Sequence, residues 1–530
     1  MRALLLSLAL LAALPALALG HAERATFYPD KSVGSVPAYR TTGPLLVVCK
    51  PDSAARIRAS WAGKGRKRTA IRNRTLRTLK KCRFRHIQSA VNAAKTGDRI
   101  QIMPGLYREE PSRAIPVKDP KCSGDEYWEA SGDNHTADGR VPTWKHQYVC
   151  PNARNLIAII GDGPDPDRVC DRKCNLQIEG MGRRARDTLI QGDRLKEDVI
   201  RADRADGFSL RNLTVEQGAY NSIDLVETNG FRLEKLVSRW AQNYGILTFT
   251  SDHGLYDNVE TYGNGDSGVY PGSGPEYHCN GYGIEMRRVN SYGNLLGASG
   301  TAGNGTWTHD SHFHDNGAGV SNDSFAPGHP GMPQDCSKWE NNTIHSNNVN
   351  YFKQNKELCD DDKTPFAQRP KEIVCAQFQV VVGVGFMLYG VNENIFRGNR
   401  IYDQWRNGVR LFGVPAAVRG VNDPDKQWDT SHGNRFVDNV FGRRRDGTPD
   451  RNGLDVFWDE QGLRNCWEGN GALTSDPATL PTCASGGSTN MTGNSAKLAA
   501  DVPCATWNPR DNPDPPGCTW FTTPAAPPDE

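Results

Sequence analysis

The sequence repeats with a fixed period, and this period limits the chain to a small group of folds. Gly207-Phe208-Ser209-Leu210 recurs 23 residues later as Gly230-Phe231-Arg232-Leu233, and Gly254-Leu255-Tyr256 follows after 24 more. The same spacing of 23 separates three apolar residues that each begin a short strand-like stretch after a Gly, Asn or Ser turn: Ile223, Ile246 and Val269. A constant period of this length is typical of a solenoid. A leucine-rich repeat is excluded because no regular Leu-x-x-Leu-x-Leu frame occurs.

Composition excludes several other classes of protein. The 530 residues are 37% hydrophobic and 23% charged, which is typical of a globular chain and not of a disordered chain or a membrane bundle. The formal net charge of +2 excludes a strongly basic nucleic-acid-binding protein, so we expect no nucleic-acid partner.

The N-terminus predicts export. Met1-Arg2 precedes an apolar run from Ala3 to Leu19, and small residues follow up to Ala22. This pattern is typical of a signal peptide, residues 1–22, cleaved after Ala22; an uncleaved anchor is the alternative. No later segment has the ~18–20 apolar residues that a membrane span needs. We therefore expect a secreted, extracellular protein with no membrane contact after cleavage.

The stretch that begins at Phe84 indicates which solenoid this is. Ile87, Ala90, Val91 and Ala94 fall on one face of a short helix, Gly97-Asp98 is a turn, and residues 99–103 alternate as a strand before Pro104-Gly105. This order resembles the opening of right-handed parallel β-helix proteins, the pectin-lyase-like fold. The resemblance implies an all-β, right-handed parallel β-helix over residues 84–465 with an N-terminal cap helix. The Asn-x-Phe/Ile-x-x-Asn pattern of the later repeats is similar to the repeats of this family.

Three regions interrupt the period. Residues 110–155 and 325–378 are expected as lateral insertions, and residues 466–530 as a Cys/Pro-rich C-terminal cap or tail. The 14 cysteines are expected to be mostly or wholly paired in an exported chain, and Cys466–Cys483 and Cys504–Cys518 are guesses based on proximity alone. Within the N-terminal segment 23–83, the stretch from Arg56 to Arg85 contains thirteen Lys or Arg and no acidic residue. We interpret it as a solvated, partly disordered linker; binding of an anionic polymer is the alternative.

Strand alternation predicts one outward ladder of side chains along the repeats. Its carboxylate and guanidinium members, Asp323 and Arg410, are by resemblance the candidates for acid–base work on a polysaccharide, with His309 and Asp310 near one edge. Its aromatic members are candidates for stacking on sugar rings: Tyr270, Phe249, Tyr389 and Phe412. The alternative is that these residues are solvated rungs, or are buried beneath the 325–378 loop.

A second group of candidates is the run of histidines and acids from His309 to Asp315. Such a group could bind a metal or supply a base, but His312 and His314 alternate in a strand that is expected to face solvent, and we assign no metal ligand. A Ca²⁺ ion is possible only by resemblance to lyases of this fold.

These observations predict a secreted, monomeric β-helix protein that binds a polysaccharide or cell-wall glycan and cleaves or modifies it by lyase or hydrolase chemistry. Two alternatives stay open: a non-catalytic glycan-binding surface or matrix protein, and a periplasmic accessory protein for a metal site. The complete motifs of pectate lyases, polygalacturonases and mannuronan epimerases do not occur, and Thr308-His309-Asp310 is the nearest remnant of the last. The fold does not define the reaction, so whether the protein is an enzyme is left open.

Overall fold

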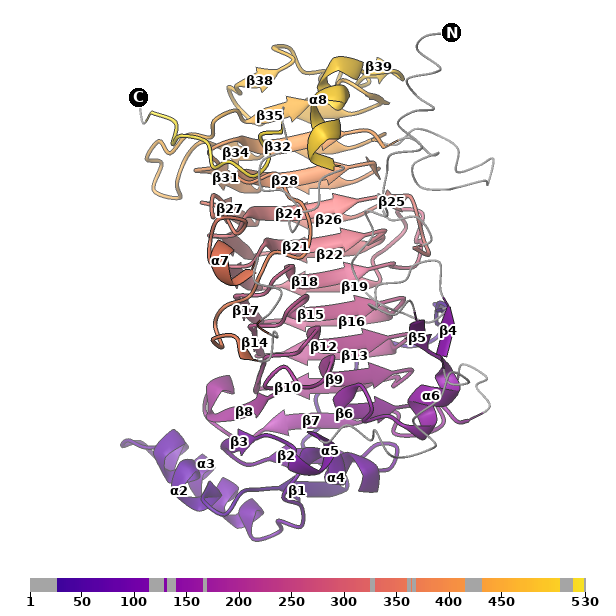
Figure 1. The fold of residues 1–530 in the computed structure, drawn as a ribbon, viewed down its shortest axis with the longest axis vertical. Coiled ribbons are helices and arrows are strands. Elements are labelled where there is room, and N and C mark those ends of the chain that lie inside the picture. Colours follow the sequence, from indigo (N-terminus) through magenta and orange to yellow (C-terminus); the bar gives the residue numbers. More distant parts are fainter. Residues whose placement is uncertain are drawn as a thin grey trace. The chain divides into compact units, whose positions relative to one another are not determined.

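The computed structural model describes residues 26–113, 128–130, 140–164, 169–324, 329–359, 364, 368–414, 431–505 and 518–528. The fold is a right-handed parallel β-helix, as the sequence predicts (Figure 1). The chain divides into two compact units, which are described separately. The N-terminal unit contains Ala22–Asn264 and Pro365–Glu372, and the C-terminal unit contains Gly265–Thr364 and Ile373–Glu530. The predicted signal peptide lies outside the described residues.

In each unit the rungs build three parallel sheets, here called A, B and C. In the N-terminal unit, sheet A contains, in spatial order, β1 (Leu45–Val48), β2 (Arg99–Ile102), β7 (Gln177–Gly180), β10 (Phe208–Arg211), β13 (Asn229–Glu234) and β16 (Asp252–Asp257). Sheet B contains β3 (Gly105–Tyr107), β8 (Thr188–Gln191), β11 (Thr214–Glu216), β14 (Val237–Arg239) and β17 (Glu260–Tyr262). Sheet C contains β6 (Asn155–Ile160), β9 (Asp198–Asp203), β12 (Asn221–Val226) and β15 (Ile246–Phe249).

The register of these strands follows the sequence period. Phe208 pairs with Phe231 and Ile223 with Ile246, each 23 residues apart. The sequence repeat aligns Gly254 with Gly230, but in the structure Gly254 pairs with Phe231. A Cβ on Gly254 would lie 2.0 Å from the Phe231 ring, so the larger ring on one rung requires glycine on the next.

The basic N-terminal segment is ordered, and its interpretation as a linker is wrong. Helix α2 (Ser53–Ser60) and helix α3 (Arg66–Leu79) pack through Ile57 and Leu76 onto a small core that includes Val47 of β1. The disulfide Cys49–Cys82 closes this hairpin. Its apolar residues are sparse but face one side, whereas its Lys and Arg side chains are exposed or half-buried. The first strand of the β-helix therefore precedes residue 84.

Helix α4 (Ile87–Ala93) forms where the sequence predicts a helix, with Ile87, Ala90 and Val91 buried. The buried carboxylate of Glu109 accepts hydrogen bonds from the backbone N–H groups of Ile87 and Gln88, both 2.8 Å long. These are two of the donors that the first turn of a helix leaves unpaired. The helix packs against β1, β2 and β6. Its function as a cap of the solenoid stays a prediction.

Between residues 110 and 155 the chain forms helix α5 (Glu110–Arg113), the antiparallel pair of β4 (Trp128–Ala130) and β5 (Arg140–Pro142), and helix α6 (Trp144–Val149). None of these described elements belongs to sheets A, B or C. A 3-10 turn, η2 (Ala185–Asp187), precedes β8.

In the C-terminal unit, sheet A contains β19 (Ile284–Arg287), β22 (Thr306–His309), β26 (Lys338–Glu340), β30 (Ile395–Arg397), β33 (Arg435–Val437) and β37 (Cys466–Glu468). Sheet B contains β20 (Asn290–Tyr292), β23 (His312–His314), β27 (Thr343–His345), β31 (Arg400–Tyr402) and β34 (Val440–Phe441). Sheet C contains β18 (Ser267–Gly272), β21 (Leu296–Thr301), β24 (Ala318–Asp323), β28 (Val384–Tyr389), β32 (Asn407–Phe412), β35 (Val456–Trp458) and β38 (Ser475–Asp476).

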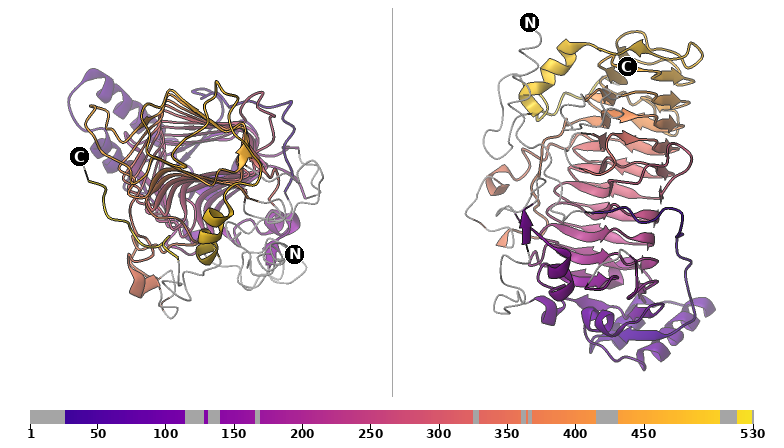
Figure 2. Two further views of the ribbon diagram at one scale, coloured as in Figure 1. Left: turned by 90° about the horizontal axis from the view of Figure 1, so that it is seen from above. Right: turned by 90° about the vertical axis from the view of Figure 1, so that its right-hand side faces the viewer.

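The remaining described elements of this unit do not belong to sheets A, B or C. Strand β25 (Gln334–Asp335) pairs with β29 (Val391–Asn392), and β36 (Gly462–Leu463) with β39 (Thr489–Asn490). Helix α7 is Lys356–Cys359, and helix α8 (Ser495–Ala505) runs along the outside of the rungs (Figure 2).

Two expected boundaries in this unit differ from the structure. The predicted insertion 325–378 includes β26 and β27, which are regular rungs of sheets A and B, so the long excursion begins after His345 and ends before Val384. Similarly, β37 and β38 extend the sheets into the predicted tail. The cysteines and prolines of these segments obscured the short strands in the sequence.

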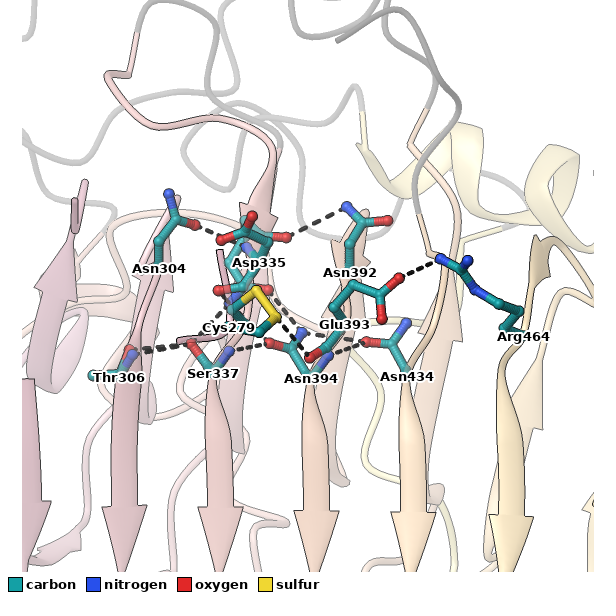
Figure 3. Close-up of a disulfide and its surroundings, with 12 residues drawn as sticks. Cys279, Asn304, Thr306, Asp335, Ser337, Asn392, Glu393, Asn394, Asn434 and Arg464 are labelled. Carbon is teal, nitrogen blue, oxygen red and sulfur yellow. Dashed lines mark hydrogen bonds and ion pairs between the residues drawn. A yellow bond between two sulfur atoms is a disulfide. The ribbon is translucent and has the colours of Figure 1, made fainter. Parts of the chain in front are cut away.

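Ladders of asparagine side chains hold the turns of the C-terminal unit together. One ladder lies in the turn between sheets A and B. There the backbone N–H of Asn342 donates to Oδ1 of Asn399 on the next coil, and the backbone N–H of Asn399 donates to Oδ1 of Asn439, both at 3.0 Å. A second ladder contains Ser337, Asn394 and Asn434, which lie side by side in Figure 3 next to the disulfide Cys279–Cys336. These side chains pair turn N–H groups that are buried and lie outside the regular strands.

The described cysteines are all in disulfides. The two guesses from proximity, Cys466–Cys483 and Cys504–Cys518, are confirmed. The other pairs described in full are Cys49–Cys82, Cys170–Cys174, Cys279–Cys336 and Cys359–Cys375. None of the helices in the described ranges has the length and apolarity to cross a membrane.

Replacement of a ladder residue tests the importance of this network. Asn399→Ala removes the side-chain oxygen that accepts from the backbone and side-chain N–H groups of Asn342. It also removes the amide group that donates to the Trp339 carbonyl and to Oδ1 of Asn439. Because the Asn342 N–H is then buried without a partner, we expect a loss of about 2–4 kcal/mol in the free energy of unfolding. Urea unfolding followed by circular dichroism measures it. Asn280→Ala, an exposed control in the same unit, should change stability by less than about 0.5 kcal/mol.

Asp206 predicts a pH dependence in the N-terminal unit. Burial raises the pKa of its carboxyl from 3.8 to about 6. The native state therefore keeps a proton that the unfolded chain loses, so this group's contribution to stability is full below pH 3.8 and is lost as the pH rises through 6. Asp206→Asn removes this loss, while its amide oxygen can still accept from the Asn229 N–H.

We expect Asp206→Asn to be about 2–3 kcal/mol more stable than wild type at pH 7 and nearly equal to it at pH 3.5, measured by urea unfolding at both values. Asp52→Asn replaces an exposed carboxylate of the same unit and serves as control. Equal effects of the two substitutions at pH 7 would contradict the buried-carboxylate account.

Candidate functional site

An accessible surface of mixed aromatic and charged side chains lies on the outward side of sheet A in the C-terminal unit. Alternation turns Ile284 and Met286 inward, where they are buried, and turns Glu285 and Arg287 outward. The same alternation turns Trp307 and His309 of β22 outward, and Lys338 and Glu340 of β26. The register aligns Glu285 with Trp307 and Lys338, and Arg287 with His309 and Glu340. We call these six residues face A.

Two rings form the centre of face A. The imidazole of His309 stacks on the indole of Trp307, with centroids 4.3 Å apart and an angle of 26° between the planes. The ring centre of Tyr282, a residue that is 40% exposed, lies 6.0 Å from that of the same indole. The ammonium group of Lys338 is 5.3 Å from the Trp307 ring centre. The result is a partly exposed aromatic platform.

Charged groups surround His309. Its Nε2 lies 3.1 Å from a carboxylate oxygen of Glu285, and its Nδ1 lies 2.8 Å from one of Asp310. Arg287 also donates to Glu285 at 2.9 Å. A neutral imidazole has one N–H donor, so both carboxylate contacts are hydrogen bonds only when the ring carries two protons. The arrangement can hold a proton on His309 and donate it. The structure places His309 on sheet A, apart from the predicted ladder on sheet C, and brings Glu285 to it.

The other predicted site residues are buried, and the expectation of an open ladder on sheet C is wrong. In the C-terminal unit, Tyr389 is 3% and Phe412 0% exposed, and both belong to an apolar cluster with Trp520 and Phe521 of the C-terminal segment. Tyr270 of the same unit and Phe249 of the N-terminal unit are each 3% exposed. These rings are covered in the structure, so their predicted function in sugar stacking gains no support from it.

Arg410 illustrates how sheet C is covered. Its guanidinium is 2.6 Å from both carboxylate oxygens of Asp501 on helix α8, and its Nε donates to the Tyr389 hydroxyl at 2.7 Å. The guanidinium also lies over the Phe412 and Phe457 rings. This ion pair fixes the helix to the rungs. Burial raises the pKa of the Tyr389 phenol, so Tyr389 is a neutral partner here.

Asp323 has the same buried setting. It accepts hydrogen bonds from Thr301 at 2.8 Å and from Ser321 at 3.5 Å, and only 9% of it is exposed. The catalytic function of Asp323 and Arg410 stays a prediction, and their contacts support a structural function.

Three histidines converge on the outward side of sheet B. His312, His314 and His345 place ligand atoms within 4.8 Å of one another, and theirs is the sole such group of three or more metal-binding side chains in the part of the chain that the structure describes. Burial, with neighbouring histidines, lowers the pKa of His312 to about 3, and burial foremost lowers that of His345 to about 4. Nitrogen ligands do not suit Ca²⁺, which takes oxygen ligands, so the Ca²⁺ expectation gains no support from this group.

Sequence reasoning missed Trp307, Glu285, Lys338 and His345. The alternation in Thr306–His309 could have identified Trp307 as a neighbour of His309 on one face. His345 gave no such signal, because it is 31 residues from its partner His314 and not 23.

No protein-family model matches the chain, and no curated protein matches its sequence. Solved structures match at low similarity. The A-module of the Azotobacter vinelandii mannuronan C-5 epimerase AlgE4 is 14% identical with a TM-score of 0.38, over 72% of this chain and 91% of that module. The pectate lyase Pel9A is 11% identical with a TM-score of 0.32, over 82% and 77%. PfbA, a surface adhesin of Streptococcus pneumoniae, is 8% identical with a TM-score of 0.36, over 72% and 85%.

The Arg410–Asp501 pair leads to a direct test of how sheet C is covered. Asp501→Asn leaves the Arg410 guanidinium buried without its counter-charge, so we expect a loss of about 3–5 kcal/mol in the free energy of unfolding. Asp476→Asn removes an exposed partner of Lys497 on the same unit and should cost less than about 1 kcal/mol. Chemical denaturation of both variants measures the difference, and equal small losses would show that α8 is not anchored here.

Proposed function

We propose that the protein binds a polysaccharide across face A of the C-terminal unit and that His309 exchanges a proton with the bound sugar during cleavage or modification. The observation that carries this proposal is the stacked Trp307–His309 pair with Glu285 and Asp310 at the two imidazole nitrogens. The disulfides support the oxidising, extracellular compartment that the N-terminal apolar run predicts.

The platform suits a sugar ring for two physical reasons. An aromatic ring offers a flat apolar surface against which the C–H groups of a sugar can pack, and a partly exposed indole loses little solvation when it does so. Around it, Glu285, Glu340 and Lys338 supply acceptors and donors for hydroxyl or carboxylate groups. A β-helix presents such groups on successive rungs about 4.8 Å apart, so a polymer can contact several rungs.

His309 is suited to proton transfer. It lies at the edge of the platform with its ring against Trp307, and its two carboxylate neighbours hold the ring in place. A positioned histidine that donates or accepts one proton at a glycosidic oxygen or at a carbon beside a uronic carboxylate accelerates such reactions by about 10²–10⁴-fold.

A non-catalytic glycan-binding protein is the second candidate, and one observation favours it. Both nitrogens of His309 already face carboxylate oxygens, so the resting ring has no lone pair directed at a substrate. The binding surface is the same for both candidates; they differ only in turnover.

Binding and turnover are measured on a panel of neutral and uronate-containing polysaccharides. Trp307→Ala should weaken binding of the preferred polymer about 3–10-fold, since one stacked ring contributes about 0.5–1.5 kcal/mol, and Trp307→Phe should retain most of it. Trp240→Ala, which removes a half-buried indole from the N-terminal unit, is the control and should bind like wild type.

The reaction is followed by new reducing ends and by the absorbance of unsaturated products. His309→Ala should remove turnover and leave affinity within about 3-fold of wild type. Turnover that survives in His309→Ala would reject the proton-transfer function, and binding that survives unchanged in Trp307→Ala would reject face A altogether. Binding without turnover in the wild type would establish the second candidate.

A further inference from the structure

The three histidines on sheet B of the C-terminal unit are presented on one surface by two neighbouring strands. Alternation in β23 turns Phe313 inward, where it is fully buried, and turns His312 and His314 outward. The register of β23 and β27 then places His345 directly opposite His314. All three side chains are half-buried.

The nitrogen atoms of the trio converge. The Nε2 atoms of His312 and His345 are 2.6 Å apart, and each histidine offers an atom within 4.8 Å of those of the others. Two nitrogens that bind one tetrahedral zinc ion at about 2.0–2.1 Å lie about 3.3 Å apart, so these two rings need to separate by only about 0.7 Å to share an ion.

Neighbouring acceptors orient two of the rings. Asp315 places a carboxylate oxygen 2.7 Å from Nδ1 of His314, and Ser346 places its hydroxyl 2.8 Å from Nδ1 of His345. The Ser346 hydroxyl donates in turn to Asp403 at 2.5 Å, which leaves its oxygen to accept from the imidazole. Both contacts direct the proton to Nδ1, and this leaves the Nε2 lone pair of His345 for a ligand, as in metal sites where a carboxylate orients each histidine. The Nε2 of His314 lies 3.1 Å from Oδ1 of Asn290, so metal binding has to displace this contact.

We propose that His312, His314 and His345 bind one divalent transition-metal ion of the zinc class, with one coordination position left for water or an anionic group of a ligand. Imidazole nitrogens select zinc, copper, nickel or cobalt over calcium or magnesium. Three protein ligands with an open fourth position are typical of catalytic and not of structural zinc sites. Half-burial of the trio leaves that fourth position accessible to solvent. The proposal does not depend on polysaccharide binding at face A.

Aromatic stacking is the other explanation for these rings. Tyr292, His314, His345 and Tyr402 do form a stacked column, with centroids 5.2, 5.3 and 4.7 Å apart. His312 also stacks on His314, with ring centres 4.0 Å apart, but stacking does not require its Nε2 to face that of His345 at 2.6 Å. A phenylalanine would also stack in the column, so replacement by phenylalanine separates the two explanations.

The experiment is a calorimetric titration of the chelator-treated full-length protein with ZnCl₂, with CaCl₂ as comparison. We expect one zinc per chain, and no saturable binding of calcium at these residues. His314→Phe and His345→Phe keep the column and should lower zinc affinity at least about 100-fold, with an unchanged melting temperature without metal. His312→Gln should have the same effect on affinity. His278→Asn, an exposed histidine of the same unit, is the matched control and should bind zinc like wild type.

Asp315 is a positioning residue in this account. Asp315→Asn should weaken zinc binding about 10–100-fold, and Asp315→Glu should restore most of it. Zinc binding in His314→Phe as tight as in wild type, or no saturable binding by the wild type, would overturn the proposal and leave the trio as part of an aromatic stack.

Discussion

The hydrogen bonds of buried asparagines on the turns are the interactions on which the C-terminal unit depends. A parallel rung pairs its backbone with the rungs above and below, but the turn between two sheets leaves N–H groups that the strands cannot satisfy. In the turn between sheets B and C, Asn294 donates its N–H to Asn316 and Asn316 donates to Asn347, at 2.9 and 3.2 Å. Each such side chain replaces a missing strand partner. The ladders hold the coils that they connect in register, and this fixed register allows side chains from different coils to meet on one face.

The outward sides of the C-terminal unit differ in how far the described parts of its chain cover them. Sheet C is closed by an apolar cluster and by the Arg410–Asp501 ion pair, so its outward aromatic rings belong to a core. The side chains of face A and the three histidines on the outward side of sheet B are half-buried. The residues that carry the two proposals lie on these sides: Trp307 and His309 on face A, and the three histidines on sheet B.

Much of the fold could be predicted from the sequence because the same residue pattern recurs in successive coils. The 23-residue spacing of Phe208 and Phe231 predicted their register, and the Asn punctuation predicted turns. The sequence also predicted that His312 and His314 face outward. It failed where the answer depends on segments distant in sequence: nothing near Arg410 indicates that Asp501 reaches it, and nothing near His314 indicates that His345 is opposite it. The basic segment misled for another reason, because its charges conceal the few apolar residues, such as Ile57, that make it fold.

Hydroxyl-radical footprinting, with and without a bound polysaccharide, tests most directly the claim that face A is the open, ligand-binding face while sheet C is closed. The account predicts that Trp307 and Tyr282 are oxidised in the free protein and protected by the glycan, and that Tyr389 and Phe412 are oxidised in neither state. Oxidation of Tyr389 and Phe412 that the glycan suppresses, with Trp307 unaffected, would contradict it and return the binding site to sheet C.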